Sequence, residues 1–201
     1  MKDLKGNNDS SGESNGESKS KIDHEDHTQN EQKPRSAKKN SREMIKLEVV
    51  TSFFYLGKFP KGPGTMGTLG AIPLVYILAS FGSLVYLSIT LVLSVIAIMA
   101  SQKYEELFAE HDSKEIVIDE VVGFLVTMAL LPMTWQSFVL AFVLFRVLDI
   151  LKPFPINWID QKINGGVGVV ADDIVAGIIA NVFLHLAYTH TTLLGVQFVG
   201  G

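Results

Sequence analysis

The chain has 201 residues, of which 47% are hydrophobic and 19% are charged, and its formal net charge is −4. This length suits one domain, and the absence of cysteine excludes a disulfide scaffold, thiolate catalysis and a zinc–cysteine site. Residues 1–61 hold 12 of the 17 Lys and Arg, whereas residues 62–201 hold five of these cations and 11 of the 21 acids. The larger part is therefore acidic and has no basic stripe, which argues against a nucleic-acid partner.

The first 42 residues are polar, mixed in charge and low in complexity. Four of them are hydrophobic, namely Met1, Leu4, Ile22 and Ala37. Such a segment cannot bury a core, so we expect residues 1–42 to form a disordered tail and residues 43–201 to form a helical domain. No apolar stretch follows the first lysines, so the start of the sequence does not resemble a secretory signal peptide.

A stretch of 41 residues without charge, from Gly62 to Gln102, follows the polar part. It holds two apolar runs, Leu69–Ser80 and Leu84–Ala100, with Phe81-Gly82-Ser83 between them. A turn at that glycine predicts a helical hairpin, with Pro73 near the start of its first helix. Each run is slightly shorter than the roughly 20 residues that span a bilayer, and Leu84–Ala100 is the better spanning candidate.

A second uncharged run, Val121–Phe145, is broken at Leu131-Pro132. The break predicts one helix that ends at Leu131 and another over Trp135–Leu151, where nearby prolines stop it. A last helix is expected over Val170–Tyr188. We find no strand alternation, so we expect an all-α fold, a compact bundle of five or six helices, several of them apolar enough to enter or span a membrane.

Helices this apolar occur in membrane proteins and also in soluble bundles where one helix is wrapped by others. The lengths of the apolar runs favour an integral membrane protein. Lys and Arg are concentrated ahead of the first run, so the positive-inside rule places the N-terminal tail in the cytoplasm.

Six acidic residues lie in or beside the apolar segments, namely Asp119, Glu120, Asp149, Asp160, Asp172 and Asp173. An uncompensated acid inside a membrane costs about 2.5–3.5 kcal/mol, so this group needs a compensating charge. Each adjacent pair has a glycine three or four residues beyond it, Gly123 or Gly177. A glycine at this spacing would let the two helices approach closely and bring the pairs toward each other.

Nearby cations are too few to neutralise these acids. Arg146, Lys152 and Lys162 lie within three residues of an acid and leave three negative charges unmatched. A hard divalent cation such as magnesium binds carboxylates together with water and phosphate oxygens, and it would offset the excess. The alternative is that the acids cap their helices, although capping uses one side chain at each helix end.

A segment rich in glycine and proline, Gly57–Leu69, precedes the first apolar run. Glycines let backbone N–H groups turn outward, and a helix N-terminus then offers a place for an anion. Thr65 and Thr68 are candidate caps or phosphate donors. The segment lacks the Gly-Lys-Ser/Thr ending of a nucleotide-binding loop, and a plain connecting loop is the alternative.

Together these motifs resemble the phosphatidylglycerophosphatase A family. The resemblance covers about residues 47–190 and rests on segments in the same order and spacing: Pro63–Leu69 with Ile72–Leu74, Ile116–Gly123, Phe145–Ile156 with Asp160, and Gly165–Gly177. It implies an all-helical, magnesium-dependent lipid phosphatase of the bacterial inner membrane. The active site would then lie at the cytoplasmic interface, on the side where the positive-inside rule places the tail. The implied reaction converts the phospholipid phosphatidylglycerophosphate to phosphatidylglycerol and inorganic phosphate.

The residues and the resemblance together give a hypothesis for the site. Carboxylates would hold one or two Mg²⁺ that activate water for attack on a phosphomonoester, and the metal ligands would be Asp119, Glu120, Asp172 and Asp173. Arg146 would pair with phosphoryl oxygens and Asp149 would either bind metal or orient Arg146, which completes the catalytic group. The substrate-binding group would be Gly64, Thr65, Gly67, Thr68 and Lys152.

Two other functions stay open on this reading. A membrane protein without enzymatic activity could use the same acids to bind or transport cations. A phosphatase of the same fold could act on another phosphorylated lipid or on a soluble phosphomonoester. Release of phosphate from a phosphomonoester lipid would separate the enzyme from the transporter.

Overall fold

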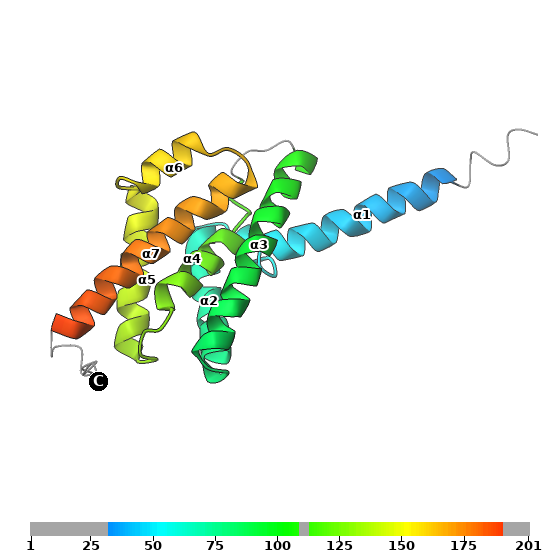
Figure 1. Cartoon of the computed structure of the whole chain (residues 1–201). Coiled ribbons are helices and arrows are strands. Elements are labelled where there is room, and N and C mark those ends of the chain that lie inside the picture. The colour runs from blue at the N-terminus through cyan, green and yellow to red at the C-terminus, as the bar shows by residue number, and fades with distance from the viewer. Residues whose placement is uncertain (1–31, 109–112, 191–201) are drawn as a thin grey trace, which may run out of the picture. The chain divides into compact units, whose positions relative to one another are not determined.

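The computed structural model describes residues 32–108 and 113–190 of the chain (Figure 1). The chain divides into two units, Met1–Asn40 and Ser41–Gly201. Helix α1 covers Gln32–Thr51, so the tail boundary expected at residue 42 falls inside a helix. Residues 1–31 of the expected tail lie outside the described residues.

The described residues of the second unit are helical, as expected. A short 3-10 helix η1 (Leu56–Lys58) follows α1, and the α-helices after it are α2 (Pro63–Ser80), α3 (Ser83–Phe108), α4 (Ile118–Met128), α5 (Trp135–Leu151), α6 (Ile156–Lys162) and α7 (Gly166–His190). The described part of the chain thus holds seven α-helices, and the expected five or six is wrong. Sequence reasoning missed α1, which lacks a long apolar run, and α6, which has seven residues.

The predicted hairpin of α2 and α3 is confirmed, and α5 has the predicted bounds. Helix α2 begins at Pro63, earlier than its apolar run, because proline suits the first turn and Gly62 supplies the preceding left-handed backbone with φ of 66°. Pro73 therefore lies inside the helix and not near its start. Helix α7 likewise begins at Gly166, ahead of the expected Val170.

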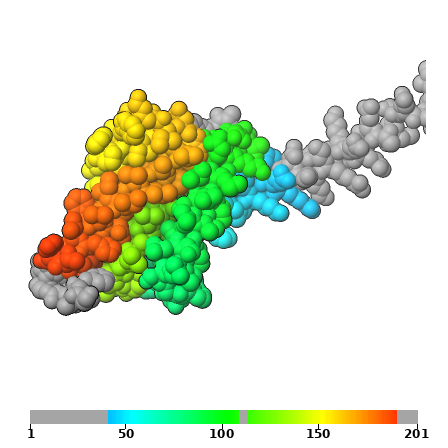
Figure 2. Space-filling model, viewed as in Figure 1, coloured from blue at the N-terminus to red at the C-terminus, as the bar shows by residue number. Residues whose placement is uncertain are grey.

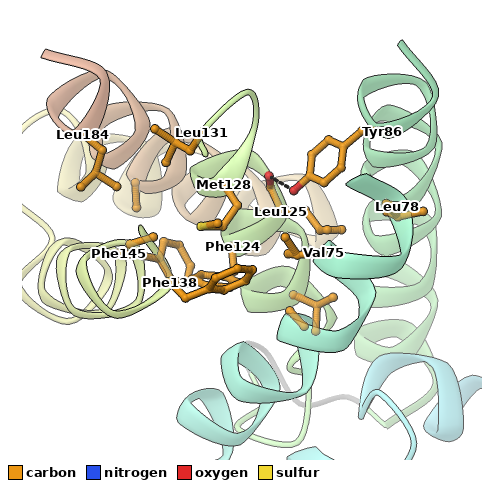
Figure 3. Packing of buried hydrophobic residues seen from close by; sticks show 14 of the residues in the cluster. Val75, Leu78, Tyr86, Phe124, Leu125, Met128, Leu131, Phe138, Phe145 and Leu184 are labelled. Carbon is orange, nitrogen blue, oxygen red and sulfur yellow. Dashed lines mark hydrogen bonds between the residues drawn. The ribbon is translucent and has the colours of Figure 1, made fainter. Parts of the chain in front are cut away.

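Helix α4 lies among α2, α3, α5 and α7 and contacts all four (Figure 1). Nine of its 11 residues are buried, as in a helix that is wrapped by others. Figure 3 shows Phe124, Leu125 and Met128 of α4 packed among Val75 of α2 and Phe138 of α5. With a rise of about 1.5 Å per residue, α4 is too short to cross a bilayer, so it serves as the core around which longer helices pack.

Both ends of α4 are held by hydrogen bonds from other elements. The backbone N–H of Val117, just before the helix, donates to the carbonyl of Thr51 at 2.9 Å. At the other end, Asn181 of α7 donates through Nδ2 to the carbonyls of Thr127 and Ala129, both at 2.8 Å. These bonds satisfy backbone groups that a helix end leaves without partners, and they fix α4 along its length.

Helices α4 and α7 cross at two glycines. A β-carbon on Gly123 would lie 2.9 Å from the carbonyl oxygen of Asp173, and one on Gly177 would overlap the carbonyl oxygen of Gly123. The close approach predicted from these glycines is confirmed. It brings the start of α4 and the second turn of α7, which carry the acid pairs, to the same end of the unit.

Three described helices, α2, α3 and α7, are long and apolar enough to cross a membrane. In α3 the buried face is small or polar, with Thr90, Ser94 and Ala97, whereas Leu91 and Met99 on the outer face are each 68% exposed. Small residues let helices pack closely in lipid, and outward apolar side chains contact acyl chains. Helices α3 and α7 lie side by side on the face in Figure 2, and the pattern indicates an integral membrane protein.

Replacing Gly177 with alanine should push α7 away from α4, because the added methyl would overlap the Gly123 carbonyl oxygen. A backbone cannot move aside as a flexible side chain can, so we expect a loss of about 1–3 kcal/mol in the free energy of unfolding. Thermal melts in detergent measure the effect, with Ile178→Ala as the matched control because Ile178 is 48% exposed. A melting temperature for Gly177→Ala equal to that of the wild type would contradict the tight crossing.

Candidate active site

A cavity of about 330 Å³ opens beside the first turns of α2 and α4, the first two turns of α7 and the end of α5. We call it the acid cavity. Its lining comprises Gly62, Pro63, Gly64, Ser113, Lys114, Ile116, Asp119, Glu120, Arg146, Asp149, Lys152, Val169, Asp172 and Asp173. Every predicted catalytic residue therefore lies in one place. The volume suits a polar head group and not a whole lipid.

Three acids form the centre of the acid cavity. Asp119 and Glu120 of α4 and Asp173 of α7 each offer a carboxylate oxygen within 4.8 Å of the others. Asp119 and Asp173 are only 8% and 3% exposed, so their charges would repel strongly without a cation between them. Among the described atoms, Glu120 Oε2 is buried without a hydrogen-bond partner. This oxygen-rich, under-satisfied group fits a hard divalent cation such as magnesium.

Burial favours the protonated forms of the two acids of α4 when no cation is bound. Burial raises the pKa of Asp119 well above its ordinary value, and the neighbouring charge of Glu120 adds to the rise. Burial also raises the pKa of Glu120 to about 8, against the lowering effects of Asp119 and Arg146. A cation bound between the acids would favour their ionised forms, so binding it and releasing protons are coupled.

The acids do not cap their helices. The N-cap of α4 is Val117, which makes no side-chain capping bond, and Asp119 Oδ1 accepts from the adjacent Glu120 N–H at 3.0 Å. Asp172 and Asp173 lie in the second turn of α7, which begins at Gly166. The capping alternative is therefore wrong. The second pair lies deeper in its helix than the expected start at Val170 would place it.

Arg146 of α5 faces the central acids. Its Nη1 donates to Asp149 Oδ2 at 2.6 Å and lies 3.8 Å from Glu120 Oε1. Asp149 thus orients the guanidinium, which was one of the two roles expected of it. The Nε of Arg146 is buried and has no hydrogen-bond partner among the described residues. The guanidinium therefore has one N–H donor that no described group uses.

Lys152 joins two acids from different helices. Its Nζ donates to Asp160 Oδ1 at 2.6 Å and to Asp172 Oδ2 at 2.7 Å. Burial opposes the charge, but these two contacts hold the pKa of Lys152 above its ordinary value, so the ammonium stays protonated. Asp172 pairs with Lys152 and is not one of the three clustered acids. Its Oδ1 is buried with no hydrogen-bond partner in the described part of the chain.

The segment rich in glycine forms one wall of the acid cavity through Gly62, Pro63 and Gly64. A β-carbon on Gly64 would overlap Glu120 Oε1 and would lie 3.1 Å from Arg146 Nη1. Glycine is required here because the carboxylate lies directly against the first turn of α2.

The other residues predicted to bind phosphate from this segment, Thr65, Gly67 and Thr68, do not line the acid cavity. They belong to the first turns of α2, where helix geometry directs them elsewhere. Thr68 is fully buried and its hydroxyl donates to the Gly64 carbonyl at 2.9 Å, while Gly67 packs against Val117. The first helix was expected to begin at Leu69, whereas α2 begins at Pro63, so these three residues lie within the helix.

Sequence reasoning missed Ser113 and Lys114, which line the acid cavity from the turn before α4. A signal for Lys114 was available, because it is one of five cations after residue 62 and precedes the first acid pair by five residues. Whether Lys114 lines the cavity depends on how α4 packs against its neighbours, which the sequence alone does not show.

Fold and site define an all-helical membrane protein whose acid-lined cavity also presents cations to an anionic group. The sequence profile of the Phosphatidylglycerophosphatase A family matches residues 49–188. A phosphatidylglycerophosphatase A of Escherichia coli (strain K12) is 37% identical over 141 residues, which is 70% of this chain and 82% of the relative. The chain belongs to the phosphatidylglycerophosphatase A family, and it is accordingly a phosphatase that hydrolyses a phosphomonoester.

Two further relatives support this placement. A phosphatidylglycerophosphatase A of Haemophilus influenzae is 39% identical over 136 residues, which is 67% of this chain and 83% of the relative. A Bacteroides thetaiotaomicron protein, named provisionally as a phosphatidylinositol-3-phosphatase, is 34% identical over 147 residues, 69% of this chain and 91% of the relative. No solved structure matches the chain.

Arg146→Lys should slow phosphate release by about tenfold or more, because lysine keeps the charge but loses the planar fork that contacts Asp149 and faces Glu120. Lys162→Ala is the control, since Lys162 is exposed and lies outside the acid cavity. Phosphate release from a phosphomonoester lipid measures both variants, and thermal melts check their folding. Near-wild-type rates for both variants would show that Arg146 has no role in the active site.

Proposed function

We propose that this protein is a magnesium-dependent phosphatase that converts phosphatidylglycerophosphate to phosphatidylglycerol and inorganic phosphate in phospholipid synthesis. The observation that carries the proposal is the cluster of Asp119, Glu120 and Asp173 beside Arg146. It occurs in a chain that is 37% and 39% identical to two phosphatidylglycerophosphatases A. The names of these relatives support the substrate, and the donor atoms of the cluster support the metal.

The metal ligands in this proposal are Asp119, Glu120 and Asp173, with Asp172 as a fourth through its unpartnered Oδ1. When bound, magnesium supplies positive charge that polarises the phosphoryl group and favours ionisation of water. The carboxylates themselves offer no hydrogen to a phosphate oxygen once they are ionised, so they would repel the substrate unless a cation lay between them.

Two cationic side chains bind the phosphoryl group in this proposal. Arg146 is held in place by Asp149 and keeps its buried Nε donor, while Lys152 is held by Asp160 and Asp172. Because both heads are fixed before the substrate arrives, little reorganisation is needed as negative charge builds on the non-bridging oxygens. Preorganised charge of this kind often accounts for much of the decrease in the activation barrier of an enzyme reaction.

The lipid itself would lie partly inside and partly outside the protein. The acid cavity, at about 330 Å³, admits the head group, and its wall at Gly62–Gly64 is the start of α2. Beyond that point α2 exposes apolar side chains such as Leu69 and Tyr76, which are 43% and 49% exposed. Acyl chains can follow this outer face in the bilayer while the phosphate meets the acids.

We further propose the bacterial inner membrane as the location, with the tail and the acid cavity on the cytoplasmic side. Support comes from the three helices able to cross a membrane and from the 12 Lys and Arg among residues 1–61, ahead of α2. Basic segments close to membrane-crossing helices are retained in the cytoplasm.

Purified protein in lipid or detergent should release phosphate from phosphatidylglycerophosphate, and EDTA should abolish the release until magnesium is restored. The panel should include phosphatidate, phosphatidylinositol 3-phosphate and glycerol 3-phosphate, because the Bacteroides relative carries a different substrate in its name. Faster release from one of these compounds would identify it as the better substrate. Release that continues in EDTA would contradict the proposed dependence on magnesium. No release from any of them would favour cation binding or transport.

Asp119→Asn, Glu120→Gln and Asp173→Asn each keep the size of the side chain but remove a negative charge from the cluster. We expect at least a hundredfold loss of activity, about 3 kcal/mol of barrier, with partial recovery at high magnesium. Asp172→Asn should also weaken the hold on Lys152. Melts in EDTA should show no destabilisation of the cluster variants, because a neutral amide avoids the cost of burying an ionisable carboxyl group beside other acids.

Glu106→Gln is the matched control for these variants, since Glu106 is exposed and lies outside the acid cavity. Rates and magnesium dependence are measured by phosphate release over a range of magnesium concentrations. Wild-type behaviour in all four acid variants would show that the proposed metal site is wrong.

A further inference from the structure

One cation of the acid cavity has no part in the chemistry proposed above. Three cations line the cavity, namely Lys114, Arg146 and Lys152. Arg146 pairs with Asp149, and Lys152 pairs with Asp160 and Asp172. Within the part of the chain that the structure describes, Lys114 forms no ion pair with a carboxylate. Its ammonium group is therefore available to an anion that enters the cavity.

The turn that carries Lys114 is held firmly on both sides. Ser113 is 5% exposed, and its carbonyl accepts the N–H of Ile116 at 2.9 Å. On the other side, a β-carbon on Gly57 would overlap the carbonyl oxygen of Glu115, so the two backbones are in contact. The backbone at Lys114 is thus fixed, while the residue is exposed and belongs to the lining of the cavity.

The substrate class of the proposed function carries two phosphates. A phosphomonoester ends the head group, and a phosphodiester joins the glycerol unit of the head group to the diacylglycerol. With the monoester against the buried Asp119, Glu120 and Asp173, the diester must lie nearer the opening, toward the lipid tails. The acids that line the cavity would repel this second phosphate, so a cation is needed there. A single lysine suits a phosphodiester, which carries one negative charge.

We propose that Lys114 is a second anion subsite, which binds the phosphodiester and so favours head groups that contain one. This inference rests on the proposed function, because a monoester lipid without a diester has nothing to offer this subsite. Lys114 contacts a part of the substrate that does not react. Its loss should therefore weaken binding of substrate and transition state equally, which raises KM and leaves kcat unchanged.

The test compares phosphatidylglycerophosphate, which has both phosphates, with phosphatidate, which has only the monoester, in mixed micelles of equal surface concentration. Lys114→Gln should raise KM for phosphatidylglycerophosphate by about fivefold to tenfold, the effect of losing one hydrogen bond, with kcat changed by less than about twofold. Its kinetics on phosphatidate should equal those of the wild type. Lys114→Arg keeps the positive charge and should have the wild-type KM. Lys162→Gln should have no effect, because Lys162 is exposed and lies outside the cavity.

Inhibition gives a second comparison that does not need phosphatidate to be a substrate. Phosphatidylglycerol carries the diester alone and inorganic phosphate imitates the monoester. Lys114→Gln should weaken inhibition by phosphatidylglycerol and leave inhibition by phosphate unchanged. An equal effect on both inhibitors or on both substrates would mean general attraction by charge and would overturn the subsite, as would no effect at all.

The failure of this inference is distinct from the failure of the proposed function. Should the wild type release no phosphate from phosphatidylglycerophosphate, both fall together. Should the wild type be active and Lys114→Gln match it in KM and in inhibition, the subsite alone is wrong. Thermal melts of each variant exclude a folding defect as the cause of a raised KM.

Discussion

The backbone contact between α4 and α7 at Gly123 and Gly177 is the constraint on which the site depends. Each glycine lies one helical turn after an acid pair and on the same face, so the contact sets the distance between the pairs. A side chain at either position would move the helices apart, and the oxygens of Asp119, Glu120 and Asp173 would no longer lie within 4.8 Å of one another. Close packing of small residues, a common device in membrane helices, here brings charges together.

Charge that is concentrated in this way has a cost in the folded protein. Asp149 and Asp172 are each matched by a cation, Arg146 or Lys152, whereas the three central acids are left with Arg146 at 3.8 Å from one of them. Burial then favours the protonated forms of Asp119 and Glu120. A divalent cation would offset the repulsion between the carboxylates and would bind the oxygens that have no hydrogen-bond partner. The arrangement is therefore better explained as a cation-binding site than as a structural part of the core.

Much of this could be predicted from the sequence, because the signals were local. Prolines and glycines marked the bounds of α5 and the turn between α2 and α3, and glycines one turn beyond the acids marked the helix crossing. What could not be predicted depends on partners distant in the chain. Thr68 looked like a phosphate donor but is turned toward the Gly64 carbonyl, and Asp160 pairs with Lys152 and not with its neighbour Lys162. Helix α6 was missed because seven residues carry too little periodicity.

The short length of α4 explains how one protein can serve a substrate that is charged at one end and apolar at the other. A helix long enough to cross the bilayer would place its ends at the two surfaces, whereas α4 has 11 residues and is enclosed by longer helices. Its first turn therefore opens into a polar cavity formed with the start of α2 and the end of α5, and its remaining turns fill an apolar core. The outer faces of α2, α3 and α7 expose apolar side chains over most of their length. A lipid can keep its tails on those faces while only its head group leaves the bilayer's apolar region, so little apolar surface of the lipid needs to be exposed to water during the reaction.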